Sequence, residues 1–219
     1  MDKSLRRHIM MQVGGGGRLP AEYQEVEYLN GGGLAYILFD FLSTYINPVF
    51  YVDYYVHTQS GGVFGSTDYV QLYNYGTLQG HTSSFAVRLG SGTAYVNTGF
   101  TPANDNIISE QGERVIVEIF VRTKVAKVNG QQLVWYNSPS TPTIPNKIPL
   151  FIRYWGGTYN SGYNGDIYEF GVKDENGDYY AQLIPCYCKA DNVAGMYDIV
   201  NDVFYTNAGS GSFTVGPDV

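Results

Sequence analysis

The sequence is poor in the residues on which several protein classes depend. It has two cysteines in 219 residues, Cys186 and Cys188. It also lacks any stretch of about 18 apolar residues, so we expect no membrane insertion. Residues two apart in a strand have Cα atoms about 6.5–7 Å apart, which is at the outer limit for a disulfide. We therefore expect both thiols to be reduced and at least half-buried, as is compatible with assembly in a cytoplasm.

Cationic side chains are scarce as well. The chain has 13 lysines and arginines against 20 aspartates and glutamates, a net charge of −7 and a pI of about 4.8. Nucleic-acid binding needs clustered cations to neutralise phosphates, so this composition disfavours a nucleic-acid partner. The histidines His8, His57 and His81 are scattered, and two cysteines without a nearby histidine make a poor metal site. No metal residues are therefore assigned.

Motifs that indicate catalysis are missing too. The sequence has no HExxH, GxSxG or P-loop pattern. A glycosidase needs two carboxylates about 5–9 Å apart on one face of a cleft. Asp166 and Glu169 lie three residues apart in a predicted strand, which directs them to opposite faces, and Glu110 and Glu113 have the same spacing in a predicted loop. We therefore expect a protein without catalytic residues that is not an enzyme.

Glycine and aromatic residues, in contrast, are abundant, with 27 glycines, 21 tyrosines and 11 phenylalanines. Turn-forming residues recur about every 8–12 residues and no helical period is sustained after residue 18, which is typical of an all-β antiparallel two-sheet β-sandwich. We predict one domain over residues 18–219. In the segment 114–120, Val115, Val117 and Ile119 should share a buried face. The predicted strands are 25–29, 35–41, 50–57, 62–65, 70–75, 84–89, 93–97, 114–122, 124–128, 132–136, 150–155, 166–173, 179–185, 194–198 and 203–206.

Two segments depart from a simple alternating pattern. The proline-rich segment 138–149 should form an extended crossover or a sheet edge, because proline cannot donate to a strand ladder. The segment 37–39 is apolar on both faces of its predicted strand. We expect something to cover its outer face.

The C-terminal segment has the most informative pattern. Two apolar-aromatic runs flank the residues 175–178 (ENGD), which predicts a hairpin because Asn and Gly tolerate positive φ. After Pro185, a second polar turn at 198–202 is flanked by further short runs. The order of GDIYEFGV, the Asn-Gly turn, LIPC and GMYDIVNDVFYTNAGSGSF resembles the closing part of a concanavalin A-like (laminin G-like) jelly-roll module.

This resemblance extends to most of the chain, over about residues 19–213. LPAEYQEVEYL at 19–29, VFG at 63–65 and VAKVNG at 125–130 are similar to further motifs of the family. One departure is GGGLAYILFDF at 31–41, which keeps the tyrosine of the family's TGTQYIDTG stretch but loses most of its polar pattern. The resemblance implies a concanavalin A-like sandwich. Such modules occur in proteins of phages that infect gut bacteria and in surface proteins of those bacteria.

Residues 1–17 form a short basic and apolar tail that ends in four glycines. The tail lacks the apolar centre and cleavage site of a secretory signal. Two interpretations stay open: a disordered terminus, or a docking peptide that gains order on binding a partner. In the second, the tail anchors the module to a virus particle. The proposed anchor residues are Leu5, Arg6, Arg7, Ile9, Met10 and Met11.

The segment 153–164 (RYWGGTYNSGYN) is the main candidate for carbohydrate binding, because it combines aromatic rings with amide groups. The alternative is that its tyrosines pack the sheet edges. Its candidate residues are Tyr154, Trp155, Tyr159, Asn160, Tyr163 and Asn164. A second set is Tyr69, Gln71, Tyr73, Asn74 and Tyr75. Some related modules hold calcium in a rim loop through oxygen ligands, and Asp53, Asp68, Asp105 and Asp166 are available for this, although no spaced cluster identifies a site.

The tail, the single module and the missing export signal favour a non-enzymatic bacteriophage virion structural protein, such as a head fibre, a capsid decoration or a tail-associated protein. Its partners would be capsid or tail proteins of the same virion, and its loops would contact host-surface glycans. The apolar-aromatic segments 35–41 and 46–56 would pack between the subunits of a homotrimer. The alternative is a carbohydrate-binding lectin or adhesin at the bacterial cell surface. A glycoside hydrolase is third.

Overall fold

The computed structural model describes residues 18–42, 44–56, 60–66, 69–78, 81–89, 92–96, 114–132 and 146–219. The regular elements of this part of the chain are all strands, so the expected all-β class is confirmed. In chain order they are β1 (Tyr23–Glu25), β2 (Leu29–Asn30), β3 (Ile37–Asp40), β4 (Val49–Tyr55), β5 (Gly61–Gly65), β6 (Val70–Leu78), β7 (His81–Leu89), β8 (Gly92–Val96), β9 (Arg114–Phe120), β10 (Val125–Val128), β11 (Gln131–Gln132), β12 (Lys147–Leu150), β13 (Arg153–Trp155), β14 (Thr158–Asn160), β15 (Asp166–Lys173), β16 (Tyr179–Cys188), β17 (Ala194–Asp198), β18 (Val203–Thr206) and β19 (Thr214–Val215).

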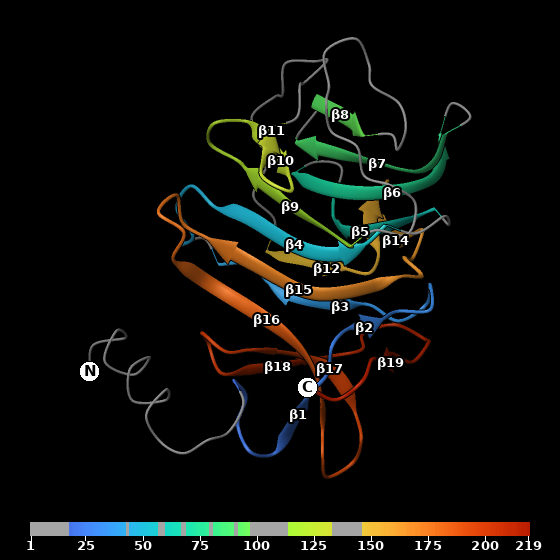
Figure 1. The fold of residues 1–219 in the computed structure, drawn as a ribbon, viewed down its shortest axis with the longest axis vertical. Helices are drawn as coiled ribbons and strands as arrows, with labels where there is room; N and C mark the ends of the chain where they lie inside the picture. Colours follow the sequence, from blue (N-terminus) through green and yellow to red (C-terminus); the bar gives the residue numbers. More distant parts are fainter. Residues whose placement is uncertain are drawn as a thin grey trace.

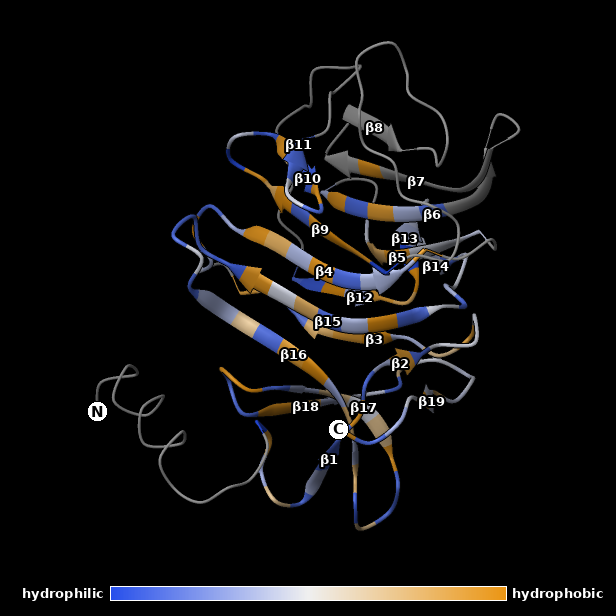
Figure 2. Cartoon of the chain, in the orientation of Figure 1, coloured by the Kyte–Doolittle hydropathy of each residue, from blue (hydrophilic) through white to orange (hydrophobic). Residues whose placement is uncertain are grey.

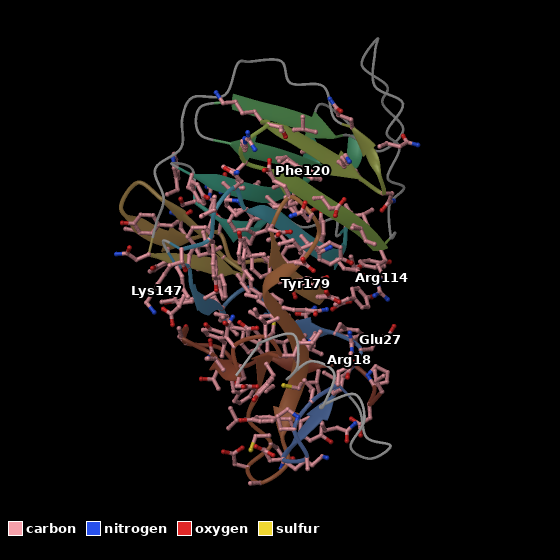
Figure 3. The ribbon with its side chains drawn as sticks, turned by 90° about the vertical axis from the view of Figure 1, so that its left-hand side faces the viewer. Arg18, Glu27, Arg114, Phe120, Lys147 and Tyr179 are labelled. Carbon is pink, nitrogen blue, oxygen red and sulfur yellow. The ribbon has the colours of Figure 1, made fainter. Side chains whose placement is uncertain are left out.

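The strands form two antiparallel sheets that pack face to face (Figure 1). The larger sheet has the order β11-β10-β9-β4-β15-β16-β17-β18, with β1 beside β16 and β2 between β15 and β19. The smaller sheet has the order β3-β12-β5-β6-β7-β8, and β13 and β14 form a separate hairpin. Figure 3 shows the molecule from the side, with Arg114 of the larger sheet on one side and Lys147 of the smaller sheet on the other. These two layers are the expected sandwich.

Aromatic rings join the two sheets. Phe39 and Phe64 of the smaller sheet lie 5.7 and 5.3 Å, between ring centroids, from Phe170 of the larger sheet. Phe50 of β4 lies 5.8 Å from Phe64, and all four rings are fully buried. Pairs of this kind contribute about 0.5–1.5 kcal/mol each beyond the area that they bury. The core therefore sits between β3 and β5 on one side and β4 and β15 on the other.

The predicted alternation in β9 is confirmed. Val115, Val117 and Ile119 are fully buried, whereas Arg114 and Ile116 are exposed. Figure 2 shows the same mixture of hydrophobic and hydrophilic residues along the neighbouring strands β4 and β15. One face of the larger sheet thus packs on the core, while the other carries polar and half-buried side chains.

Both predicted C-terminal hairpins are present. The first joins β15 and β16, where Gly177 has a φ of 93° and the Asp174 carboxylate accepts a hydrogen bond from the Asn176 nitrogen at 2.8 Å. The second joins β17 and β18 in antiparallel register. The bounds of β15, β17 and β18 agree with the predicted segments. These strands were accessible to prediction because their turns are encoded locally.

A buried carboxylate explains the YDxVN pattern between β17 and β18. Asp198 is fully buried, and its Oδ1 accepts hydrogen bonds from the backbone nitrogens of Gln182 at 3.1 Å, Val200 at 3.0 Å and Asn201 at 3.3 Å. Its Oδ2 accepts a further one from the Asn201 side chain at 2.7 Å. A buried acid is tolerated here because its lone pairs are satisfied by its own turn and by the backbone of the neighbouring strand β16.

Three predicted segments need correction. The segment 25–29 contains parts of two strands, β1 and β2, and 150–155 divides at Phe151, whose φ is 66°. The described end of the proline-rich segment, β12, lies between β3 and β5 instead of at an edge. Proline is tolerated there because β5 pairs with β12 only at Leu150, one residue beyond Pro149. Leu38, on the outer face of β3, is half-buried, as expected for a partly covered strand.

The cysteines agree with the sequence prediction. Both are free; Cys186 is buried and Cys188 is half-buried. Burial raises the pKa of the Cys186 thiol to about 12. A search of the described residues for a helix that could cross a membrane finds none.

Candidate functional site

The carbohydrate candidates fall mainly on one hairpin, β13–β14. Its two-residue turn is Gly156-Gly157, with φ values of 59° and 82°. Positive φ at both central positions is the requirement of a type I′ turn, which matches the twist of the flanking strands. Two glycines meet that requirement without strain, so this pair of residues favours a tight, projecting hairpin.

The hairpin register divides the candidates between two faces. Directly paired residues point to the same side of an antiparallel pair, and neighbours along a strand point to opposite sides. The first face, called here the Trp155 face, carries Arg153, Trp155, Thr158 and Asn160. The second face, called here the Tyr159 face, carries Tyr154 and Tyr159. The aromatic candidates of this hairpin therefore lie on two separate surfaces.

Close backbone approach fixes this hairpin against the smaller sheet. Tyr154 forms a parallel bridge with Ser66, and Gly162 forms one with Gly62. A Cβ atom on Gly62 would lie 2.6 Å from the Arg153 nitrogen, so any larger residue there would push the hairpin away. The hairpin is thus held by β5.

An exposed indole and a guanidinium dominate the Trp155 face. Trp155 is 53% exposed, the most of any aromatic residue among the exposed hydrophobics of the described chain. The guanidinium carbon of Arg153 lies 4.8 Å from the Trp155 ring centroid and 4.5 Å from that of Tyr73 on β6. Both distances lie in the range of cation–π interaction. Arg153 thus connects the exposed indole to the sheet beneath it.

Asn160 is committed to the hairpin itself. Its amide nitrogen donates to the Trp155 carbonyl at 3.1 Å and to the Thr158 hydroxyl at 3.2 Å. Its amide oxygen accepts from Arg153 Nε at 2.9 Å and from the Ser161 hydroxyl at 3.2 Å. Asn160 therefore positions Arg153 and Trp155, and its role as a direct sugar contact stays a prediction.

Tyr163 is not a surface residue. It is fully buried, its ring lies 6.0 Å from the Tyr54 ring, and its hydroxyl donates to the Tyr55 carbonyl. Its prediction as a carbohydrate contact is wrong, because a sugar cannot reach it. Asn164 is half-buried and already has an interaction partner. Neither belongs to the hairpin faces.

The Tyr159 face borders an open groove of about 480 Å³. Tyr159 is 40% exposed and stacks on Tyr36, with ring centroids 5.5 Å apart and planes at 25°. The exposed side chain of Leu34 forms part of the rim. The remaining lining comes from Gly33, Ile152, Asn160, Ser161, Gly162, Ala208, Gly209 and Ser210.

Asn207 holds two walls of this groove together and was not singled out from the sequence. Its Oδ1 accepts hydrogen bonds from the nitrogens of Tyr36 at 3.1 Å and Gly209 at 2.7 Å, and its amide nitrogen donates to the Gly211 carbonyl at 2.5 Å. The TNAGSGSF motif contains this residue, so the pattern had marked a structural position without showing its role.

The second predicted carbohydrate set is largely inaccessible. Tyr69, Gln71 and Asn74 are buried, with exposed fractions of 1%, 4% and 0%. Only Tyr73, which contacts Arg153, is half-buried, and the side chain of Tyr75 lies outside the described residues. Of these tyrosines, Tyr69 packs within the fold.

The two calcium candidates that the structure describes, Asp53 and Asp166, already have partners within the protein. The Asp53 carboxylate pairs with Arg114 at 2.8 and 2.9 Å, and Asp166 accepts a hydrogen bond from the Asn30 side chain at 2.8 Å. Asp68 and Asp105 lie outside the described residues. Among the residues that are described, no three His, Cys, Asp or Glu side chains lie close enough to hold a metal ion.

Charged and aromatic side chains also gather on the outer face of the larger sheet, where Figure 3 labels Arg114 and Tyr179. The Arg114 guanidinium lies 3.8 Å from the Tyr168 ring centroid and pairs with a carboxylate, as above. Lys173 lies 3.9 Å from the Tyr51 ring centroid and 3.7 Å from a Glu118 oxygen. The outer-face cluster is the name used here for the two cations and their partners: Arg114, Tyr168, Asp53, Lys173, Tyr51 and Glu118. Its two cations each contact both a ring and a carboxylate.

Several predictions fall on residues outside the described part of the chain. These include the whole tail, and with it the proposed anchor residues Leu5, Arg6, Arg7, Ile9, Met10 and Met11. The virion location, the capsid or tail partners and the homotrimer stay predictions.

The fold has a counterpart among solved structures. It is similar to the crystal structure of a candidate carbohydrate-binding protein from Bacteroides ovatus, with a TM-score of 0.58 and 14% sequence identity. The match covers 90% of this chain and 62% of the other, so this chain spans less than two thirds of that one. No family model and no curated protein matches the sequence. At this identity the likeness shows the fold alone, an all-β sandwich.

Proposed function

We propose that this protein is a non-catalytic carbohydrate-binding module whose sugar contact is the Trp155 face of the β13–β14 hairpin. The observation that carries the proposal is the exposed indole of Trp155 on a rigid, projecting turn. An aromatic ring in this position offers an apolar surface for the C–H face of a sugar at little entropic cost, because the ring has few rotatable bonds.

Polar groups beside the indole suit the same ligand. The Thr158 hydroxyl is on the Trp155 face, directly across from Trp155, and Arg153 adds N–H donors next to the ring. Sugar sites combine an apolar stacking surface with a few fixed hydrogen-bonding groups that set orientation. The likeness in fold to the candidate carbohydrate-binding protein from Bacteroides ovatus adds an analogy that is consistent with this role.

The experiment is a glycan array probed with the full chain. Each glycan that binds is then titrated into the protein while the intrinsic tryptophan fluorescence is measured. Trp155→Ala should remove the array signal. Loss of one aromatic stacking contact should weaken binding by roughly 10-fold or more, given the typical energy of such contacts. The melting temperature should change little, because the Trp155 side chain is mostly exposed.

Tyr159→Ala is the matched control, since it removes an exposed ring from the other face of the same hairpin. It should keep the array signal. Loss of binding in Tyr159→Ala with retention in Trp155→Ala would move the site to the groove and contradict the proposal. The absence of any glycan signal for the unaltered protein would contradict carbohydrate binding altogether.

A further inference from the structure

Arg153 has no acidic partner among the described residues, which sets it apart from Arg18, Arg114 and Arg122, the other arginines whose side chains the structure describes. Arg18 pairs with Glu25, Arg114 with Asp53 and Arg122 with Glu175. Within the described part of the chain, Arg153 forms no salt bridge, and its guanidinium contacts the Asn160 oxygen and the rings of Tyr73 and Trp155. This is unusual in a chain whose acids outnumber its lysines and arginines by 20 to 13.

The Arg153 head group is held in one orientation. Its Nε donates to Asn160 Oδ1 at 2.9 Å, and the Asn160 amide nitrogen is itself fixed by the Trp155 carbonyl. This hydrogen bond uses the Nε–H, so the terminal N–H groups of the Arg153 guanidinium remain available to a ligand. The side chain is half-buried, so its donors are partly desolvated but accessible.

From these contacts we propose that the Trp155 face is selective for sugars that carry a carboxylate, such as hexuronic or sialic acids. This inference rests on the proposed carbohydrate-binding function and narrows its ligand class. A guanidinium presents a planar fork of donors that matches a carboxylate in bidentate geometry, and such charge-assisted bonds are about twice as strong as neutral ones. In the complex the sugar ring lies on the Trp155 indole and its carboxylate meets the terminal N–H groups of Arg153.

A second donor on the same side of the smaller sheet also lacks an acceptor among the described residues. Gln71 lies two residues before Tyr73 on β6, so the two side chains share one face of the strand. The Gln71 amide nitrogen is buried and has no hydrogen-bond partner in the described part of the chain. Because this amide is buried, it makes no ligand contact itself, and the proposed carboxylate contact rests on Arg153.

The test compares acidic oligosaccharides with their carboxyl-reduced forms. The probes are hexuronate and sialic-acid oligosaccharides, each paired with the neutral sugar obtained by reducing its carboxyl group to an alcohol. Binding is measured by isothermal titration with the full chain. The acidic member of at least one pair should bind roughly 10- to 100-fold more tightly than its reduced partner, the range expected for one charge-assisted bidentate contact.

Variants of Arg153 test whether this residue causes the preference for acidic sugars. Arg153→Gln should abolish the preference for the acidic member of the pair, and Arg153→Lys, which keeps the charge but not the fork, should restore only part of it. Arg122→Gln is the matched control, because it removes the same charge at an exposed site on another surface. It should leave the preference unchanged, and thermal unfolding of each variant checks that the hairpin region remains folded.

The outcomes separate this inference from the proposed function. Equal binding of acidic and reduced sugars, with loss of both in Trp155→Ala, would overturn the carboxylate selectivity and leave carbohydrate binding intact. In that case Arg153 serves to pack the hairpin on Tyr73. A preference that persists in Arg153→Gln would also overturn the inference. Binding to none of the probes or array glycans would overturn both.

Discussion

The outer-face cluster and the Trp155 face are built from the same kinds of side chain but differ in charge balance. In the outer-face cluster, Arg114 and Lys173 each lie over a tyrosine ring and also contact a carboxylate. On the Trp155 face, Arg153 lies beside two rings and an amide oxygen, with no carboxylate among the described residues. The first region pairs its cations with its own carboxylates, whereas in the described part of the second the cation contacts only neutral groups.

This difference distinguishes a structural surface from a binding surface. Cation–π contacts occur in both regions, so they do not by themselves mark a site. A carboxylate already seated on Arg114 would have to be displaced by an anionic ligand, at the cost of exposing the buried Asp53 group. Arg153 imposes no such cost. The comparison therefore favours the hairpin over the broader sheet surface as the place where a ligand binds.

Arg114→Gln should give the largest loss of stability among the changes that test this contrast. It leaves Asp53, which is 6% exposed, without its cation, and an unpaired buried charge costs about 1–3 kcal/mol in the free energy of unfolding. Urea unfolding measures the effect. Arg122→Gln, which breaks an exposed ion pair, should cost about 0–1 kcal/mol and serves as the control. An equal decrease in stability in both variants would show that Asp53 is adequately solvated.

Asn160→Asp should convert the Trp155 face into a paired surface like the outer-face cluster. The new carboxylate oxygen would take the position of the amide oxygen that lies 2.9 Å from Arg153 Nε. Stability should fall by about 1 kcal/mol, because the carboxylate cannot replace the hydrogen bonds from the amide nitrogen to the Trp155 carbonyl and the Thr158 hydroxyl. Binding of acidic sugars should drop by roughly 10-fold or more, while their carboxyl-reduced forms are affected less. Undiminished acidic-sugar binding would argue against Arg153 as the anion contact.

Arg153→Gln should reduce stability by less than Arg114→Gln. The substitution removes two cation–π interactions at a partly exposed position, worth about 0.5–1 kcal/mol each, and it leaves no charge unpaired. Urea unfolding of the two variants side by side makes the comparison directly. If Arg153→Gln proved the more destabilising, Arg153 would be mainly a structural residue of the hairpin.

The smallest effect concerns tyrosines and emerges only in alkaline solution. Burial raises the pKa of Tyr168, beside Arg114, to about 12. The unfolded chain loses this proton near pH 10, so between about pH 10 and 12 the folded state binds more protons and the free energy of unfolding falls as pH rises. Thermal unfolding across this range should show the decline, and Tyr168→Phe should reduce it. A melting temperature that is constant over this range in the unaltered protein would contradict the assignment.

Much of the fold was predictable because its information is local. The alternation in β9 and the Asn-Gly turn between β15 and β16 depend on neighbouring residues, and the structure confirms both. The position of β12 inside the smaller sheet was not predictable in this way. Its pairing with β3 joins residues more than one hundred positions apart, and a proline suggested an edge. Strand order depends on tertiary contacts, which the strand propensities of individual residues do not specify.

The candidate site was predictable in outline but not in detail. The segment 153–164 contains the exposed hairpin, as expected from its aromatic and glycine content. The separation of Trp155 from Tyr159 depends on the register across a two-residue turn, and the burial of Tyr163 depends on its contact with Tyr55. The lack of an acidic partner for Arg153 among the described residues could not be inferred from composition, because it depends on where the acids lie in space.

The hydrogen bonds of Asn207 have a consequence for how the groove comes into being during synthesis. Tyr36 and Asn207 are separated by 171 positions in the chain, yet one amide joins them. A nascent chain that has emerged only as far as β18 has Tyr36 and Tyr159 but lacks the segment that closes this wall. Contacts between distant positions form late, because the intervening chain must first be ordered. The groove therefore forms only when the C-terminal segment has folded, and a chain that ends before Asn207 would lack it.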